Sequence, residues 1–167
     1  MIGLSLFALL AAACFSDLRT RRIPNLLVLT TAVAGIAIAV LTKPWAAGLI
    51  QAGTGFGTGL VIWLPFYALG MIGAGDVKLF AAASTFLGPR LAIEASLYTA
   101  LYGGVLAFVY MLTRSGVAGT LIRVGQGVRQ PELLRNDPSA QRRRMPYALA
   151  IAAGILTVVF WPGYIVT

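Results

Sequence analysis

The sequence predicts an all-α membrane protein with six transmembrane helices. Of its 167 residues, 59% are hydrophobic and only 11% are charged, and the mean hydropathy is +0.86. A soluble domain carries roughly 25% charged residues, so this composition is typical of a chain that lives in a bilayer. Short polar or proline-containing turns separate the apolar runs, which favours several membrane-crossing helices. The length corresponds to a single domain, residues 1–167.

The first apolar run covers residues 2–16 and is followed by a basic cluster. A secretory signal carries its positive charges before the apolar run, so we interpret this run as a transmembrane helix with its N-terminus outside. It is shorter than the roughly 20 residues that cross the hydrocarbon, so we expect the helix to continue through Asp17. The Asp17 carboxylate would then lie at the inner edge of the bilayer. Ile23-Pro24-Asn25 ends the segment, because the residue before a proline avoids the α region.

The third predicted helix carries two overlapping GxxxG spacings, Gly53/Gly57 and Gly55/Gly59. This spacing lets membrane helices approach closely, so we expect a close-packing face here. A dinucleotide-binding loop is excluded because no strand precedes the glycines. The six predicted helices cover residues 2–16 extended through Asp17, 26–42, 46–72, 75–88, 91–113 and 146–162.

Turns and basic residues set the predicted topology. Lys43 and Arg90 fall in the two proposed outer turns, Lys43-Pro44-Trp45 and Gly88-Pro89-Arg90, and every other Lys and Arg falls on the proposed inner side. The positive-inside rule therefore places both termini outside and the arginine-rich loop, residues 114–145, in the cytoplasm. We assign the net charge of +8 to this rule and to contact with anionic membrane lipids, and exclude nucleic-acid binding.

Two acids stand out, because charged side chains at membrane depth are costly and mark functional sites. Asp76 follows Gly73 and Gly75 and precedes Lys78, between two long apolar runs. The predicted helix lengths bring Asp76 to the same inner edge as Asp17. A third acid, Glu94, is expected to form a local ion pair with Arg90 four residues earlier rather than to take part in catalysis.

Composition restricts the chemistry that these acids can perform. The chain has no histidine and one cysteine, Cys14, which excludes Ser/His/Asp and Cys/His catalysis and a disulfide within the chain. We expect no metal ion and no cofactor. Two adjacent carboxylates share a proton, so one can take a proton from water while the other polarises a peptide carbonyl. The alternative is that Asp17 pairs with Arg21 and Asp76 with Lys78 as ordinary surface ion pairs.

Three segments resemble the motifs of type IV prepilin peptidases. Residues 73–78, GAGDVK, are similar to the GxGD signature, which presenilin-like and preflagellin proteases also carry. Residues 17–25 resemble the first-aspartate segment of the family, with Asp17, Arg19 and the sequence IPN. Residues 146–151 resemble its P-Y-G-x-A-I segment, with Ala148 in place of the glycine. The resemblance extends over nearly the whole chain.

The resemblance implies that Asp17 and Asp76 are the catalytic dyad of an aspartic endopeptidase. It places the protein in the bacterial cytoplasmic membrane, with its active site at the cytoplasmic face. Gly73 and Gly75 would leave space for an extended substrate backbone. The expected substrate-binding or site-shaping residues are Gly73, Gly75, Lys78, Arg19, Pro24, Asn25, Pro146 and Tyr147.

The resemblance further implies a substrate and its alternatives. Family members remove the short basic leader from prepilins, and this chain lacks the cysteine-rich insert of larger members that also methylate the new N-terminus. It therefore resembles the minimal form that serves tight-adherence (Flp-type) pili, and we expect no methyltransferase activity. Its expected partners are a prepilin, membrane lipids and pilus-assembly components. The alternatives are preflagellin or another GxGD protease, a proton-coupled transporter, and a non-enzymatic assembly scaffold.

Overall fold

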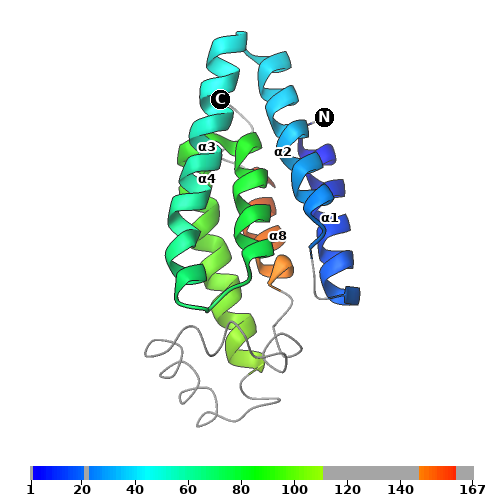
Figure 1. Cartoon of the computed structure of the whole chain (residues 1–167), viewed down its shortest axis with the longest axis vertical. Helices are drawn as coiled ribbons and strands as arrows, with labels where there is room; N and C mark the ends of the chain where they lie inside the picture. Colours follow the sequence, from blue (N-terminus) through cyan, green and yellow to red (C-terminus); the bar gives the residue numbers. More distant parts are fainter. Residues whose placement is uncertain (1, 21–22, 111–146, 161–167) are drawn as a thin grey trace.

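The described part of the chain is an all-helical bundle (Figure 1). The computed structural model describes residues 2–20, 23–110 and 147–160, and contains no strand among them, which confirms that the fold is all-α. The whole 114–145 loop, Pro146 and the C-terminal ends of the predicted helices 91–113 and 146–162 lie outside these ranges. The helices are α1 (Ile2–Thr20), α2 (Asn25–Thr42), α3 (Trp45–Ala68), α4 (Ala74–Tyr110) and α8 (Ala148–Phe160).

Helices α1 to α4 are long and apolar enough to cross a membrane, whereas α8 has 13 residues. No more than 28% of the residues in any of the four candidate spans are buried inside the bundle. The rest of their apolar surface faces outward, and Leu4 and Leu41 are 76% and 84% exposed. So much exposed apolar surface is unfavourable in water and is expected against lipid. The chain is therefore an integral membrane protein; six crossings and the sidedness of the termini stay predictions.

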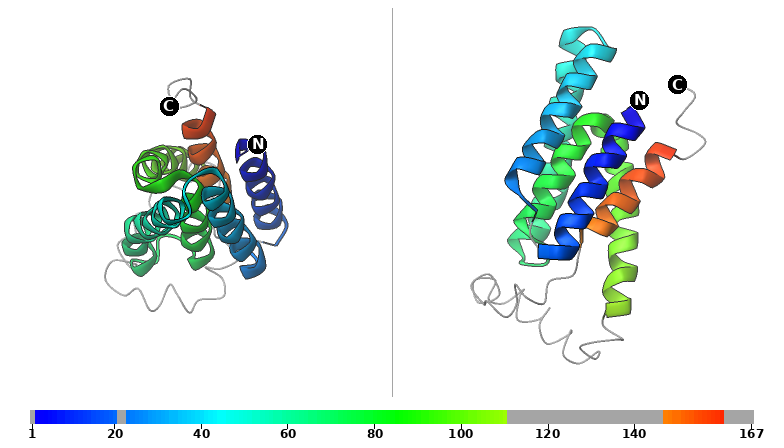
Figure 2. Two further views of the ribbon diagram at one scale, coloured as in Figure 1. Left: turned by 90° about the horizontal axis from the view of Figure 1, so that it is seen from above. Right: turned by 90° about the vertical axis from the view of Figure 1, so that its right-hand side faces the viewer.

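Gly88 divides α4 into two arms that run in opposite directions (Figures 1 and 2). Its φ of 77° and ψ of 176° are not helical, and glycine adopts a positive φ without the steric cost that a side chain brings. Pro89 follows, and a proline suits the first turn of the second arm. This bend confirms the predicted Gly88-Pro89-Arg90 turn. Just beyond it, Arg90 Nε lies 3.5 Å from Glu94 Oε1, which confirms the predicted local ion pair.

Helix α1 continues through Asp17 to Thr20, as its length predicted, but α3 ends earlier than expected. It stops at Ala68 rather than at residue 72. Gly70 has a φ of 72°, its N–H donates to the Tyr67 carbonyl, and the Met71 N–H donates to the Phe66 carbonyl. This is the hydrogen-bond pattern of a Schellman cap, which ends a helix at a left-handed glycine.

The start of α4 lies one residue before the predicted range of 75–88. The helix begins at Ala74, and Asp76 lies within its first turn. The Asp76 and Val77 N–H groups both donate to the Gly73 carbonyl, at 3.1 and 3.3 Å. These bonds form the first turn of the helix ahead of the acid, which fixes where Asp76 lies relative to the preceding loop.

Only one of the two GxxxG pairs in α3 packs within the chain. A Cβ added at Gly55 would collide with the Ser84 carbonyl oxygen and lie 2.9 Å from the Gly88 Cα, and one at Gly59 would lie 2.7 Å from Ser84 Oγ. Cβ atoms added at Gly53 and Gly57 would have no neighbour within 4 Å in the part of the chain that the structure describes. The close-packing face is therefore Gly55/Gly59, against the first arm of α4, whereas the Gly53/Gly57 spacing meets no described helix.

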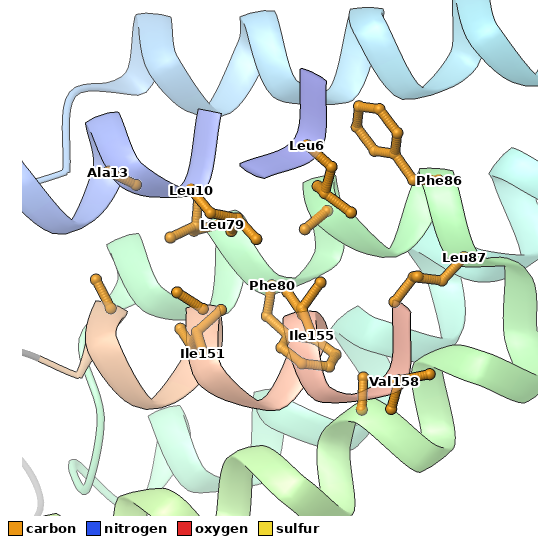
Figure 3. Close-up of a cluster of buried hydrophobic side chains, with 14 of the residues drawn as sticks. Leu6, Leu10, Ala13, Leu79, Phe80, Phe86, Leu87, Ile151, Ile155 and Val158 are labelled. Carbon is orange, nitrogen blue, oxygen red and sulfur yellow. The ribbon is translucent and has the colours of Figure 1, made fainter. Parts of the chain in front are cut away.

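The buried core lies between α1, the first arm of α4 and α8 (Figure 3). Leu6 and Leu10 of α1, Phe80 of α4, and Ile151 and Ile155 of α8 are at most 2% exposed. Their interdigitation joins the first helix of the chain to the last described one. The core therefore sets the relation between the two ends of the sequence, which matters for the site below.

Adding one methyl group to α3 tests which glycine face packs. We expect Gly55→Ala to destabilise the protein by about 1–3 kcal/mol, because its Cβ meets backbone atoms that cannot move aside. The matched substitution Gly57→Ala should leave stability unchanged or slightly higher, since alanine favours a helix and meets nothing. Thermal unfolding of both variants in detergent measures the difference, and equal midpoints would contradict the packing described here.

Candidate functional site

The segments that carry the two candidate acids lie at the same end of the bundle. The end of α1, the start of α2, the turn between α3 and α4, and the start of α8 all gather at the lower end in Figure 1. A Cβ added at Gly75 would lie 3.4 Å from the Ile23 side chain. The turn that holds Asp76 is therefore in contact with the segment that follows Asp17.

Asp17 is buried, with 6% of its surface exposed, and it lies against the start of α8. Its Oδ2 accepts a hydrogen bond from the Ala148 N–H at 3.3 Å. The first N–H groups of a helix have no partner within the helix, and the start of a helix favours a negative charge. This bond therefore satisfies a buried backbone donor and gives the Asp17 carboxylate a partner.

Cys14 lies one turn before Asp17 on α1, and it contacts the backbone carbonyl group of Ala148, the residue whose N–H binds Asp17. Its Sγ donates to the Ala148 carbonyl oxygen at 3.4 Å. Residues three apart on a helix share a face, so Cys14 and Asp17 together contact the N–H and the C=O of Ala148. Ala148 itself is completely buried. Helix α1 thus holds the first residue of α8 at two points.

Asp76 is held by the turn that precedes it. Its Oδ2 accepts a hydrogen bond from the Gly73 N–H at 3.1 Å, while its own N–H donates to the Gly73 carbonyl at 3.1 Å. Such a reciprocal pair closes the first turn of a helix and fixes the rotamer of the acid. Gly73 is buried, whereas Asp76 is only half-buried. The carboxylate is therefore anchored and still partly accessible.

The dipeptide Tyr147–Ala148 connects the two acids. Asp17 accepts a hydrogen bond from the Ala148 N–H, and the pKa of the Tyr147 phenol is raised by burial and, to a smaller extent, by the negative charge of Asp76. The two carboxylates are far apart in the sequence, yet one contacts this dipeptide and the other influences it electrostatically. Shared-proton chemistry needs two acids in one neighbourhood, which this arrangement favours.

The remaining predicted site residues fall into two groups. Gly73, Gly75 and Tyr147 lie beside the acids, as described above. Pro24 precedes the first residue of α2, where its φ of −60° suits a helix start, and Asn25 begins that helix. The residues Arg19, Pro24, Asn25 and Lys78 have exposed side chains, and Pro146 lies outside the described residues. Within residues 2–20, 23–110 and 147–160, no cluster of three or more His, Cys, Asp or Glu side chains could hold a metal ion.

The sequence prediction missed two residues that build this site, Cys14 and Trp63. The Trp63 ring meets the Tyr147 ring edge-on, with centroids 5.9 Å apart. Its Nε1 donates to Ser96 Oγ at 3.3 Å. Cys14 carried a usable signal, since it lies three residues before Asp17. Trp63 carried none, because its contact depends on how α3 and α8 are placed in space.

Comparison with known proteins identifies the family of this chain. Residues 4–112 match the model of the type IV leader peptidase family. The chain belongs to this family. The match includes both Asp17 and Asp76, and it confirms the resemblance to prepilin peptidases noted from the motifs.

This chain is similar, along nearly the whole of its own length, to a curated relative from Bacillus subtilis (strain 168). It is named prepilin leader peptidase/N-methyltransferase, and it is 29% identical over 166 residues. The alignment covers 96% of this chain and 55% of the relative, so the chain spans about half the length of that protein. No solved structure matches the chain.

Two substitutions of Asp17 separate its contact with Ala148 from its charge. We expect Asp17→Ala to destabilise the protein by about 1–3 kcal/mol, because the Ala148 N–H is left buried without its acceptor. Asp17→Asn keeps an oxygen that can accept this bond, so its loss should be clearly smaller. Thermal unfolding in detergent compares the two variants; an equal loss in both would mean that the hydrogen bond contributes little.

Proposed function

We propose that the chain is a membrane aspartic endopeptidase that removes the short basic leader from type IV, Flp-like prepilins. One observation carries the proposal: in a member of the leader peptidase family, Asp17 accepts a hydrogen bond from Ala148, and the charge of Asp76 helps to raise the pKa of the adjacent Tyr147 at the same end of the bundle. The positive-inside pattern supports the cytoplasmic face of the inner membrane for this end.

The two carboxylates would act as a general acid and a general base. Like charges at close range cannot both ionise cheaply, so one acid keeps a proton while the other is ionised. The ionised acid removes a proton from a water molecule as that water attacks the scissile carbonyl carbon. The protonated acid donates a hydrogen bond to the carbonyl oxygen, and the departing amine then receives a proton. No covalent intermediate is needed.

The surroundings of the dyad suit a peptide substrate at the membrane boundary. The apolar segment of a prepilin would pack beside the outward-facing apolar helices, which brings the scissile bond to the inner edge of the bilayer. Gly73 and Gly75 would leave room for an extended backbone next to Asp76. Arg19 and Lys78, exposed at the same end, would bias which acid is ionised.

Removing either charge tests the dyad directly. We expect Asp17→Asn and Asp76→Asn each to lower leader removal by at least about 100-fold, because general acid and base catalysis are both lost. Candidate prepilins are co-expressed with each variant, and immunoblots follow the loss of the leader. Glu94→Gln is the matched control, since that carboxylate pairs with Arg90 near the Gly88 bend and should leave processing intact.

Several outcomes of this experiment would overturn the proposal. Normal trimming by either Asn variant would exclude a two-acid mechanism. An absence of trimming by the wild-type protein with every candidate prepilin would exclude the substrate class. Normal trimming combined with loss of proton flux would favour the transporter alternative.

The proposal does not include methylation of the new N-terminus. The relative that carries this activity in its name is nearly twice as long, and here α1 ends at Thr20 and α2 begins at Asn25, so no insert separates them. We therefore expect mature pilin with an unmodified N-terminal amine. Mass spectrometry of pilin from cells that express this chain as the sole family member checks this, and a peptide heavier by one methyl group would contradict it.

A further inference from the structure

The phenol of Tyr147 occupies a space that exists because residue 103 has no side chain. Gly103 lies on the second arm of α4, and a Cβ added there would collide with the Tyr147 hydroxyl oxygen. It would also lie 2.6 and 2.7 Å from Cζ and Cε2 of the same ring. No side chain fits at this position while the ring stays in place. At the next residue, Gly104, an added Cβ would have no neighbour within 4 Å among the described residues.

Trp63 of α3 holds the same ring from a second direction. Its ring meets the Tyr147 ring at 68° and is 4% exposed. It is itself fixed by the hydrogen bond to Ser96 and by contact with Phe80, with ring centroids 5.5 Å apart. Because Trp63 is buried and tied to α4, it cannot move aside if the Tyr147 ring is displaced.

A displacement of the Tyr147 ring would reach the backbone that Asp17 binds. The adjacent residue, Ala148, donates its N–H to Asp17 and accepts from Cys14, while burial and the charge of Asp76 raise the pKa of the Tyr147 phenol. Tyr147 and Ala148 share one peptide unit, which is rigid. The position of the ring against Gly103 and Trp63 is therefore coupled to the backbone that Asp17 holds.

We propose that Gly103 is a positioning residue for the Asp17/Asp76 site. Its bare backbone forms, with Trp63, the socket for the Tyr147 phenol, and this socket sets where the Tyr147–Ala148 dipeptide lies between the two acids. The catalytic consequence rests on the proposed peptidase function, whereas the placement of the dipeptide does not. The two are therefore tested by different measurements.

The placement is tested through Cys14, the one cysteine in the chain. Its thiol donates to the Ala148 carbonyl, so a shift of the dipeptide should free it for reaction. We expect Gly103→Ala to raise the rate of alkylation by N-ethylmaleimide in the purified protein at least about threefold, as local opening does for protected groups. Gly104→Ala, one residue away on an open face, should react like the wild type. Equal rates in the two variants would overturn the placement.

The catalytic consequence is tested by a double-mutant cycle with Tyr147→Ala. We expect Gly103→Ala to lower kcat by about 10- to 100-fold with little change in KM, because a displaced site is not correctly aligned. In the Tyr147→Ala background, which has no ring to displace, the same substitution should change kcat by less than about twofold. The substrate is the prepilin that the wild type trims, and Gly104→Ala is the control in both backgrounds.

These measurements separate the possible failures. An equal loss of kcat from Gly103→Ala in both backgrounds would show that the glycine acts through general folding and would overturn the positioning role. If Gly103→Ala lowers kcat in the wild-type background but not in the Tyr147→Ala background, misfolding cannot be the cause, and the result supports the positioning role. If the alkylation rates differ as expected while the wild type trims no prepilin, the placement stands and the peptidase function fails.

Discussion

A buried hydrogen bond from the Ala148 N–H to Asp17 joins the first helix of this protein to its last described helix. A carboxylate at 6% exposure requires a partner, and the free N–H at a helix start requires an acceptor. The single hydrogen bond therefore satisfies both the buried carboxylate and the buried N–H. Cys14 adds a second contact to the same residue, and the core between α1, α4 and α8 holds the two helices at this distance.

Two chain reversals that depend on glycine bring Asp76 and then Gly103 to the same end of the bundle. Gly70 ends α3 in a left-handed conformation, and Gly88 bends α4 into two arms, each with a positive φ. The first reversal leaves Asp76 in the first turn of α4 beside the end of α1. The second returns the chain so that Gly103 lies against Tyr147. Backbone conformations open mainly to glycine thus help to place residues from α1, α3 and α4 around the dipeptide at the start of α8.

The proposed chemistry and the membrane setting are physically consistent. Outward-facing apolar side chains keep the helices in lipid, while the polar groups of the site gather at one end of the bundle, where water can reach a half-buried Asp76. A hydrolase for a membrane-anchored peptide needs both conditions. The rigid aromatic contacts around Tyr147 provide the fixed geometry that general acid and base catalysis requires.

The sequence by itself determined the features that depend on neighbouring residues. Apolar length and Pro24 predicted that α1 continues through Asp17, Gly88-Pro89 predicted the bend, and a spacing of four predicted the pair of Arg90 with Glu94. Only the tertiary structure decided that Gly55/Gly59 packs while Gly53/Gly57 does not, and that Trp63 and Gly103 enclose Tyr147. Those contacts depend on how each helix is rotated and crossed against its neighbours, and hydrophobic periodicity does not specify that in a chain that is apolar on every face.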